Sequence, residues 1–72
     1  MNRPHVEVRQ GKLGWRWYVR AEDGGILTQG VENSRRAARC AAESWILHRW
    51  QKAPTDISVS WETPDGTMQE VK

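Results

Sequence analysis

Hydrophobic and polar residues alternate in two stretches near the start of the chain, and this pattern predicts two β-strands. In residues 5–9, Val6 and Val8 alternate with polar side chains, the period of a strand with one buried face. Residues 15–21 give the clearest strand signal. One face of that strand carries Trp15, Trp17 and Val19, and the other carries Arg16, Tyr18 and Arg20. We expect the apolar face to join the core.

A third strand is predicted over residues 26–32, after a turn formed by Glu22-Asp23-Gly24-Gly25. Its alternation is ambiguous because Ile26 and Leu27 are adjacent, and Gly30 indicates a bulge or a strand end. Because the connections are short, we expect residues 5–32 to form a three-stranded antiparallel meander. A meander of this size needs another element packed on its apolar face.

A helix over residues 34–52 supplies that cover. Asn33 or Ser34 can cap it, residues 35–52 contain no glycine or proline, and Pro54 follows its end. At 100° per residue, one stripe of the helix contains Ala37, Ala38, Ala41, Ala42 and Trp45. A second, narrower apolar stripe contains Cys40, Leu47 and Trp50. We expect Cys40 to be a small packing residue and His48 to border the core.

The last part of the chain, residues 57–71, predicts a β-hairpin. Ile57, Val59 and Trp61 alternate with polar residues, and Thr63-Pro64-Asp65-Gly66 is typical of a type I turn. This hairpin either extends the sheet or folds against the helix, and the pattern leaves both placements open. The predicted fold is therefore an α+β domain of order β-β-β-α-β-β that spans residues 1–72.

Composition narrows the classes of protein to which this chain can belong. Its 72 residues include five tryptophans and no phenylalanine, so indoles take the place of smaller core residues. We expect Trp15, Trp17, Trp45 and Trp61 in the core and Trp50 exposed beside the polar side of the helix. A single cysteine excludes an intrachain disulfide. No apolar run reaches the ~18 residues of a membrane span, and no signal-peptide pattern is present, so we expect a cytoplasmic protein without membrane contact.

The net charge of +2 conceals a segregation of charge along the chain. Residues 1–20 and 35–53 each carry five basic side chains against one glutamate, whereas residues 21–34 and 54–72 are acidic. If strands 5–9 and 15–21 pair, Arg9, Arg16, Tyr18 and Arg20 form one basic patch with an aromatic ring. The alternative is that Glu7 and the acidic turn neutralise this patch. Near the helix start, Arg35, Arg36 and Arg39 are candidates for gripping phosphate alongside Ser34.

The run Gly14-Trp15-Arg16-Trp17-Tyr18-Val19-Arg20, the Asp23-Gly24 turn and Ser34-Arg35-Arg36-Ala37-Ala38 resemble two groups of proteins. One is the arm-type DNA-binding domain of tyrosine recombinases from phages and transposons. The other is a set of small bacterial and phage β-β-β-α proteins of uncharacterised function. The resemblance covers residues 5–50 and implies that an open sheet face, with Arg16, Tyr18 and Arg20, contacts double-stranded DNA. We expect no recombination chemistry, because these residues hold no counterpart of the recombinase catalytic domain, and the hairpin over residues 57–71 departs from the recombinase pattern.

Two functions follow from these patterns. The first is a non-enzymatic nucleic-acid-binding module of a phage, prophage or other mobile element. The second is a protein-interaction module that uses Leu47, Trp50 and the C-terminal strand to bind a protein partner or to form a homodimer. Catalysis finds no support, because Cys40 and His48 lie too far apart along a helix to act together. We therefore expect no enzyme activity, no metal and no cofactor.

Overall fold

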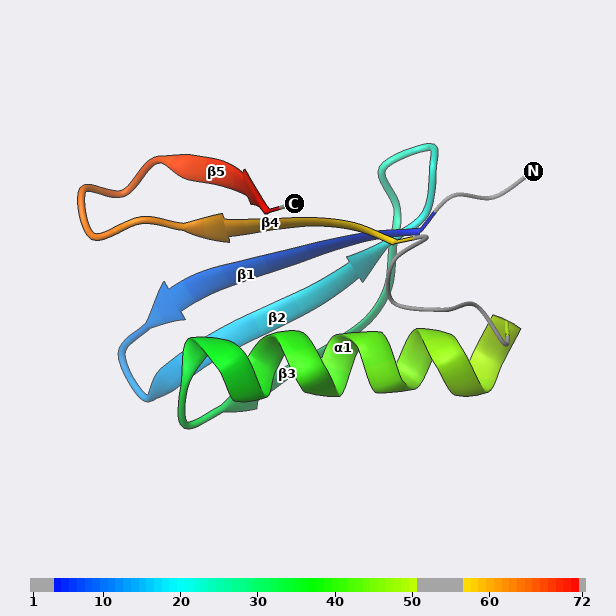
Figure 1. The fold of residues 1–72 in the computed structure, drawn as a ribbon, viewed down its shortest axis with the longest axis horizontal. Helices are drawn as coiled ribbons and strands as arrows, with labels where there is room; N and C mark the ends of the chain where they lie inside the picture. The colour runs from blue at the N-terminus through cyan, green and yellow to red at the C-terminus, as the bar shows by residue number, and fades with distance from the viewer. Residues whose placement is uncertain (1–3, 51–56, 72) are drawn as a thin grey trace.

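The described part of the chain forms a five-stranded mixed sheet with one helix laid on one side (Figure 1). The computed structural model describes residues 4–50 and 57–71. Its elements, in chain order, are β1 (His5–Gly11), β2 (Gly14–Arg20), β3 (Ile26–Glu32), α1 (Arg35–Trp50), β4 (Ser58–Glu62) and β5 (Met68–Val71). The predicted order β-β-β-α-β-β and the α+β class are confirmed.

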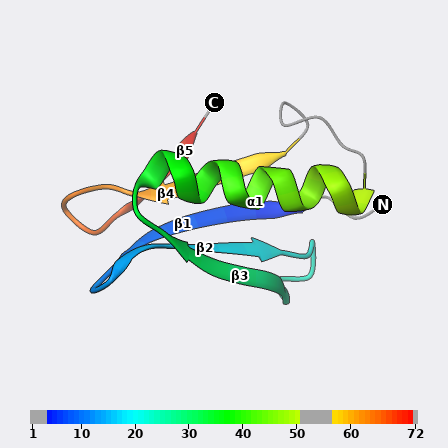
Figure 2. The same ribbon diagram turned by 90° about the horizontal axis from the view of Figure 1, so that it is seen from below.

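The strand order β3-β2-β1-β4-β5 settles where the C-terminal hairpin lies. β2 pairs antiparallel with β1 and with β3, which confirms the meander. β4 runs parallel to β1, and β5 pairs antiparallel with β4, so the hairpin extends the sheet. Parallel neighbours need a crossover connection. α1 provides it by carrying the chain along one side of the sheet, as Figure 2 shows.

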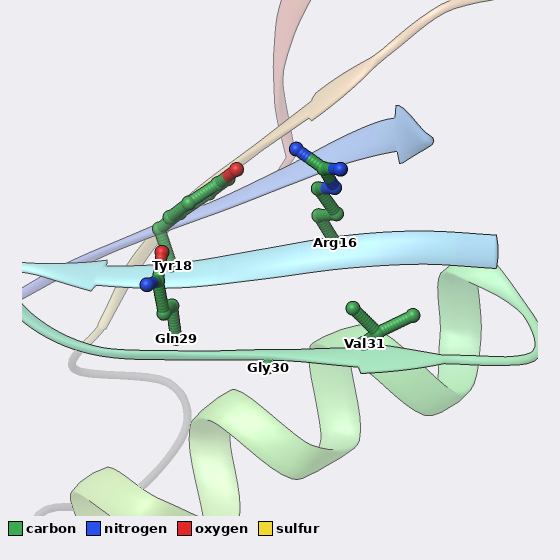
Figure 3. Close-up of a pocket in the computed structure, with 5 residues that line it drawn as sticks. All are labelled: Arg16, Tyr18, Gln29, Gly30 and Val31. Atoms are coloured by element: carbon green, nitrogen blue, oxygen red, sulfur yellow. The ribbon is translucent and has the colours of Figure 1, made fainter. Parts of the chain in front are cut away.

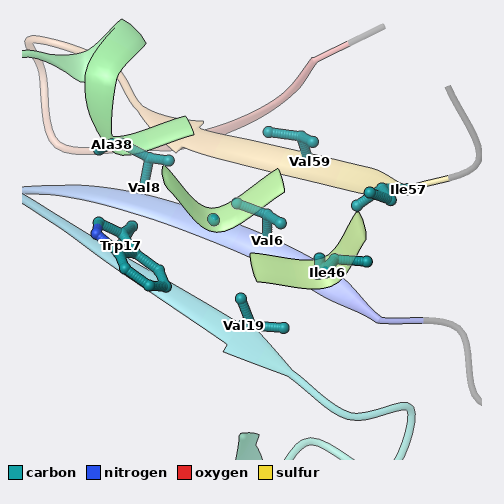
Figure 4. Packing of buried hydrophobic residues seen from close by; sticks show 9 residues of the cluster. Val6, Val8, Trp17, Val19, Ala38, Ile46, Ile57 and Val59 are labelled. Carbon is teal, nitrogen blue, oxygen red and sulfur yellow. The ribbon is translucent and has the colours of Figure 1, made fainter. Parts of the chain in front are cut away.

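The core lies between α1 and the sheet (Figure 4). The alternation correctly predicts the inward residues of the first two strands, since Val6, Val8, Trp17 and Val19 are all buried. The remaining buried residues of the hydrophobic core cluster are Ala38, Ala42, Ile46, Ile57 and Val59. Small residues in the first half of α1 let its backbone approach the sheet closely. Trp15, Trp45 and Trp61 pack on the edges of this core and are partly buried.

α1 begins at the predicted cap. Ser34 Oγ accepts a hydrogen bond from the backbone N–H of Ala37 at 3.1 Å, which satisfies one of the unpaired donors at the helix start. Ile46, which the predicted stripe omits, is the largest fully buried side chain. Residues 51 and 52 of the predicted helix lie outside the described residues. Within the described residues, no helix has the length and apolar character needed to cross a bilayer.

The second apolar stripe predicted on the helix is wrong. The buried positions Ala38, Ala42 and Ile46 recur every four residues, and Trp50 continues that series. Trp50 is therefore half-buried, not exposed, and its ring lies 5.5 Å from that of Trp45 in an edge-to-face arrangement. Cys40 and His48, expected to pack, are exposed. Each lies two residues, or about 200°, beyond a buried position and so faces away from the sheet.

The irregularity in β3 falls at Leu27 and not at Gly30. Val19 pairs with Thr28 and Arg20 pairs with Ile26, so Leu27 is an extra residue in the ladder. Gly30 is paired in register with Trp17. β3 is also an edge strand, and its Ile26, Leu27 and Val31 remain about half exposed.

Candidate functional site

The side of the sheet opposite α1 is not covered by any described element, and we call it the open face. The register places there the side chains of Gln29 and Val31 (β3), Arg16, Tyr18 and Arg20 (β2), His5, Glu7 and Arg9 (β1), Ser58, Ser60 and Glu62 (β4), and Met68 and Glu70 (β5). The C-terminal hairpin extends the sheet and does not fold across it, so this face stays accessible.

Pairing of β1 with β2 brings the four predicted strand residues together. Arg9 lies opposite Arg16, and Glu7 lies opposite Tyr18. Arg20 occupies the next position on the same face of β2, and its Cζ lies 5.9 Å from the centre of the Tyr18 ring. Arg9, Arg16, Tyr18 and Arg20 therefore form one continuous surface on β1 and β2.

Glu7 is the carboxylate at the centre of this surface. Its side chain is 11% exposed, and it accepts hydrogen bonds from Arg9 Nη2 at 2.8 Å and from Arg20 Nε. Burial raises the pKa of Glu7, but the hydrogen bonds and charges of Arg9 and Arg20 outweigh it and hold the pKa below its ordinary value of 4.5. Glu7 thus neutralises part of the charge of the basic patch, as the alternative interpretation of the sequence predicts. Because Arg9 and Arg20 share this one carboxylate, the neutralisation is incomplete.

Arg16 differs from its two basic neighbours. It is exposed and takes part in no ion pair among the described residues. Its side chain passes over the backbone of Gly11, where a Cβ would lie 3.3 Å from Arg16 Cγ and Nε. Arg16 therefore presents its charge to solvent, and Arg9 and Arg20 add to the local positive potential.

A hollow of about 300 Å³ lies between β2 and β3 on the open face (Figure 3). Arg16 and Tyr18 line it from β2, and Gln29, Gly30 and Val31 line it from β3. A second and wider hollow of about 590 Å³ lies on the other side of Arg16, lined by Gln10, Gly11 and Lys12. No pattern of residues points to Gln29 or Val31, because the extra residue Leu27 interrupts the alternation of β3.

The helix arginines lie on the opposite side of the sheet. Arg35 Cζ is 3.9 Å and Arg39 Cζ is 5.7 Å from the centre of the Trp61 ring. Arg39 also forms an ion pair with Glu43 at 3.2 Å. The two basic segments therefore do not share a face, and Arg35 and Arg39 help to pack α1 against β4. Arg36 is exposed.

Comparison of the chain with family models, curated proteins and solved structures found no match. The assignment of a function rests on the chemistry of the open face.

The β4–β5 half of the open face is acidic. Glu62 and Glu70 lie on this half, and no arginine or lysine accompanies them in β4 or β5. Glu62 Oε1 accepts a hydrogen bond from the backbone N–H of Gln10 at 2.8 Å. The open face thus has a positive side over β1 and β2 and a negative side over β4 and β5. This polarity gives the side over β1 and β2 the charge that attracts anions.

The residues predicted for protein interaction are separated by the packing of α1. Leu47 is 44% exposed, whereas Trp50 packs on Trp45 and the core. In the described residues, no three histidine, cysteine or carboxylate side chains come close enough together to hold a metal ion.

Proposed function

We propose that this chain is a small non-enzymatic module that binds nucleic acid through the open face over β1 and β2. Double-stranded DNA is the expected partner, in the cytoplasm and in the setting of a phage or other mobile element that the sequence resemblance suggests. The observation that carries the proposal is the placement of exposed Arg16 beside Tyr18 on the open face of the sheet. Guanidinium groups bind phosphate oxygens in a bidentate manner, and a tyrosine ring packs on sugars or bases.

Charge supports the same surface. Three guanidinium groups, those of Arg9, Arg16 and Arg20, surround one carboxylate. The surface therefore keeps a net charge of about two, which corresponds to about two neutralised phosphates. When two phosphates are neutralised, a plot of the logarithm of affinity against the logarithm of salt concentration has a slope of about −1.8.

Titration of a short labelled DNA duplex at several salt concentrations tests this proposal. We expect affinity to fall about tenfold between about 50 and 200 mM salt. The absence of binding at low salt would exclude the function.

A pair of arginine variants separates the open face from general positive charge. Arg16→Ala removes the exposed guanidinium of the proposed site and should reduce the salt slope by about one. Arg49→Ala is the matched control, because Arg49 is exposed near the end of α1 and outside every predicted site. It removes the same charge and should leave the slope unchanged. Equal effects of the two substitutions would indicate nonspecific attraction by net charge.

The helix arginines form a separate part of the proposal. Arg36 is exposed on α1, and Arg35 and Arg39 contact Trp61. If the helix arginines contact phosphate, they do so on the side of the sheet opposite Arg16. One short duplex therefore cannot contact both the helix arginines and the open face at once. Arg36→Ala should therefore leave binding to a short duplex unchanged if the open face is the site.

A protein-interaction role remains the second candidate, because Leu47 is exposed and β5 is a sheet edge with one unpaired side. Such a module would bind a protein partner or a second copy through Leu47 and β5. Sedimentation of the wild type and of Leu47→Ser over a range of concentrations tests self-association. A mass that stays monomeric at every concentration would exclude the homodimer.

A further inference from the structure

The hollow between β2 and β3 is framed by two rows of side chains. Tyr18 lies opposite Gln29, and Arg16 lies opposite Val31. Each pair forms one row across the two strands, and the two rows are two residues apart along each strand, which corresponds to about 6.7 Å. Stacked bases in a nucleic-acid strand are about 3.4 Å apart. A flat ring inserted edge-first between the rows would therefore lie about one stacking distance from each.

The side chains of the two rows suit a nucleobase. The phenol of Tyr18 and the guanidinium of Arg16 are planar groups of the kind on which unpaired bases stack. The amide of Gln29 offers both a donor and an acceptor to the polar edge of a base. Val31 supplies an apolar contact beside Arg16. The volume of about 300 Å³ is at the lower end of pockets that hold small organic groups.

We propose that this slot, lined by Arg16, Tyr18, Gln29 and Val31, takes one unpaired base of a single-stranded nucleic acid. The second hollow, which Arg16 shares with Lys12, places a further cation where an adjacent phosphate of the strand would lie. The inference rests on the proposed function, because the same face binds phosphate in both, but it changes the preferred partner from an intact duplex to a strand with an unpaired base. A base in an intact duplex is covered on both faces by its neighbours, so only a single strand, a tail or a bubble can fill the slot.

The test compares an oligo-dT strand with a duplex of the same length, using the purified chain at low salt. We expect the wild type to prefer the single strand. Tyr18→Leu should weaken single-strand binding about 5- to 150-fold and duplex binding much less, because a paired base cannot stack on the ring. Tyr18→Phe is the matched control, because it keeps the ring and should keep the affinity. Arg16→Lys keeps the charge but loses the planar group, so it should weaken single-strand binding without changing the salt slope.

Two further measurements sharpen the test. Gln29→Ala, at an exposed position, should reduce the difference in affinity among oligo-dA, oligo-dC and oligo-dT. A free mononucleotide should compete weakly, because it lacks the neighbouring phosphate. Equal competition by the mononucleotide would overturn the assignment to a strand.

The outcomes distinguish the base slot from the proposed binding of phosphate by the open face. If the duplex binds as tightly as the single strand and Tyr18→Leu changes neither affinity, the base slot is wrong and the phosphate-binding face stands. If neither nucleic acid binds at low salt, both proposals fail. Circular dichroism of each variant shows whether a loss of binding reflects a loss of fold.

Discussion

The indole of Trp17 lies against the backbone of Gly30 on the adjacent strand, where any side chain would collide with it. A Cβ placed on Gly30 would be 2.6 Å from Cε2 and Cζ2 of the ring. Trp17 is only 9% exposed and lies within the core, so the ring has no open space into which it can move. The glycine in β3 is thus what allows so large a residue on the inner face of β2.

Gly30→Ala should therefore destabilise the fold. Overpacking of this kind costs about 1–3 kcal/mol of unfolding free energy. At a position without a collision, the same change would stabilise by about 0.4–1 kcal/mol, because it restricts the unfolded chain. Urea unfolding, followed by circular dichroism, measures the difference.

A double-mutant cycle identifies the collision as the cause. In a Trp17→Leu background the smaller side chain leaves room, so Gly30→Ala should cost much less than it does in the wild type. An equal cost in both backgrounds would show that the contact with Trp17 is not the cause.

The alternation of apolar and polar residues is enough to predict much of this fold, because the face that a side chain occupies depends only on its position along its own strand. The sequence from Trp15 to Arg20 assigns each side chain of β2 to a face without reference to any other strand. It could not show that Trp17 needs Gly30 opposite it, since a periodic pattern gives faces and not neighbours. For the same reason residues 57–71 had two placements, and only the pairing of β4 with β1 distinguishes them.

The candidate site was predictable to a similar extent. Arg16, Tyr18 and Arg20 share a face because they alternate along one strand. Gln29 was missed because the extra residue Leu27 shifts the register of β3. That the helix arginines lie on the other side of the sheet depends on which sheet face α1 covers. That is a tertiary property, which the basic composition of residues 35–53 does not reveal.

The stacking of Arg35 on Trp61 predicts a structural role for that arginine. Arg35→Ala removes a guanidinium that lies 3.9 Å from the ring centre and should lower the unfolding free energy by about 0.5–1 kcal/mol. Arg36→Ala is the matched control one residue away and should have little effect. Thermal unfolding of the two variants side by side measures the difference, and equal stabilities would contradict the role assigned to the stack.

Asp65 organises the turn between β4 and β5. It accepts hydrogen bonds from the hydroxyl of Thr63 and from the backbone N–H and hydroxyl of Thr67, which lower the pKa of Asp65 to about 2. Asp65→Ala should therefore speed hydrogen exchange of the β5 amides. Asp23→Ala, which removes a similar contact from the β2–β3 turn, should leave β5 exchange unchanged. Unchanged exchange in both variants would mean that strand pairing alone holds β5.

Protonation of Glu7 should weaken the fold in acid. Because its folded pKa lies below its ordinary value, the carboxylate contributes stability above pH 4.5, and this contribution is lost as the pH falls through the folded pKa. The stability difference between wild type and Glu7→Gln should thus be largest near neutral pH and shrink in acid. Glu22→Gln, at an exposed turn position, is the control and should show little difference at any pH. Urea unfolding across this range gives both differences.

The same Glu7→Gln substitution should change DNA binding in the opposite direction from stability. Loss of the carboxylate raises the net charge of Arg9, Arg16 and Arg20 from about two to about three, so the salt slope should steepen by about one unit and affinity at low salt should rise. The measurement is the titration of a labelled DNA duplex at several salt concentrations, at a pH and temperature at which the variant remains folded. Weaker binding by the folded variant would mean that Glu7 holds Arg9 and Arg20 in the geometry that contacts phosphate, because only loss of that geometry can outweigh the added charge.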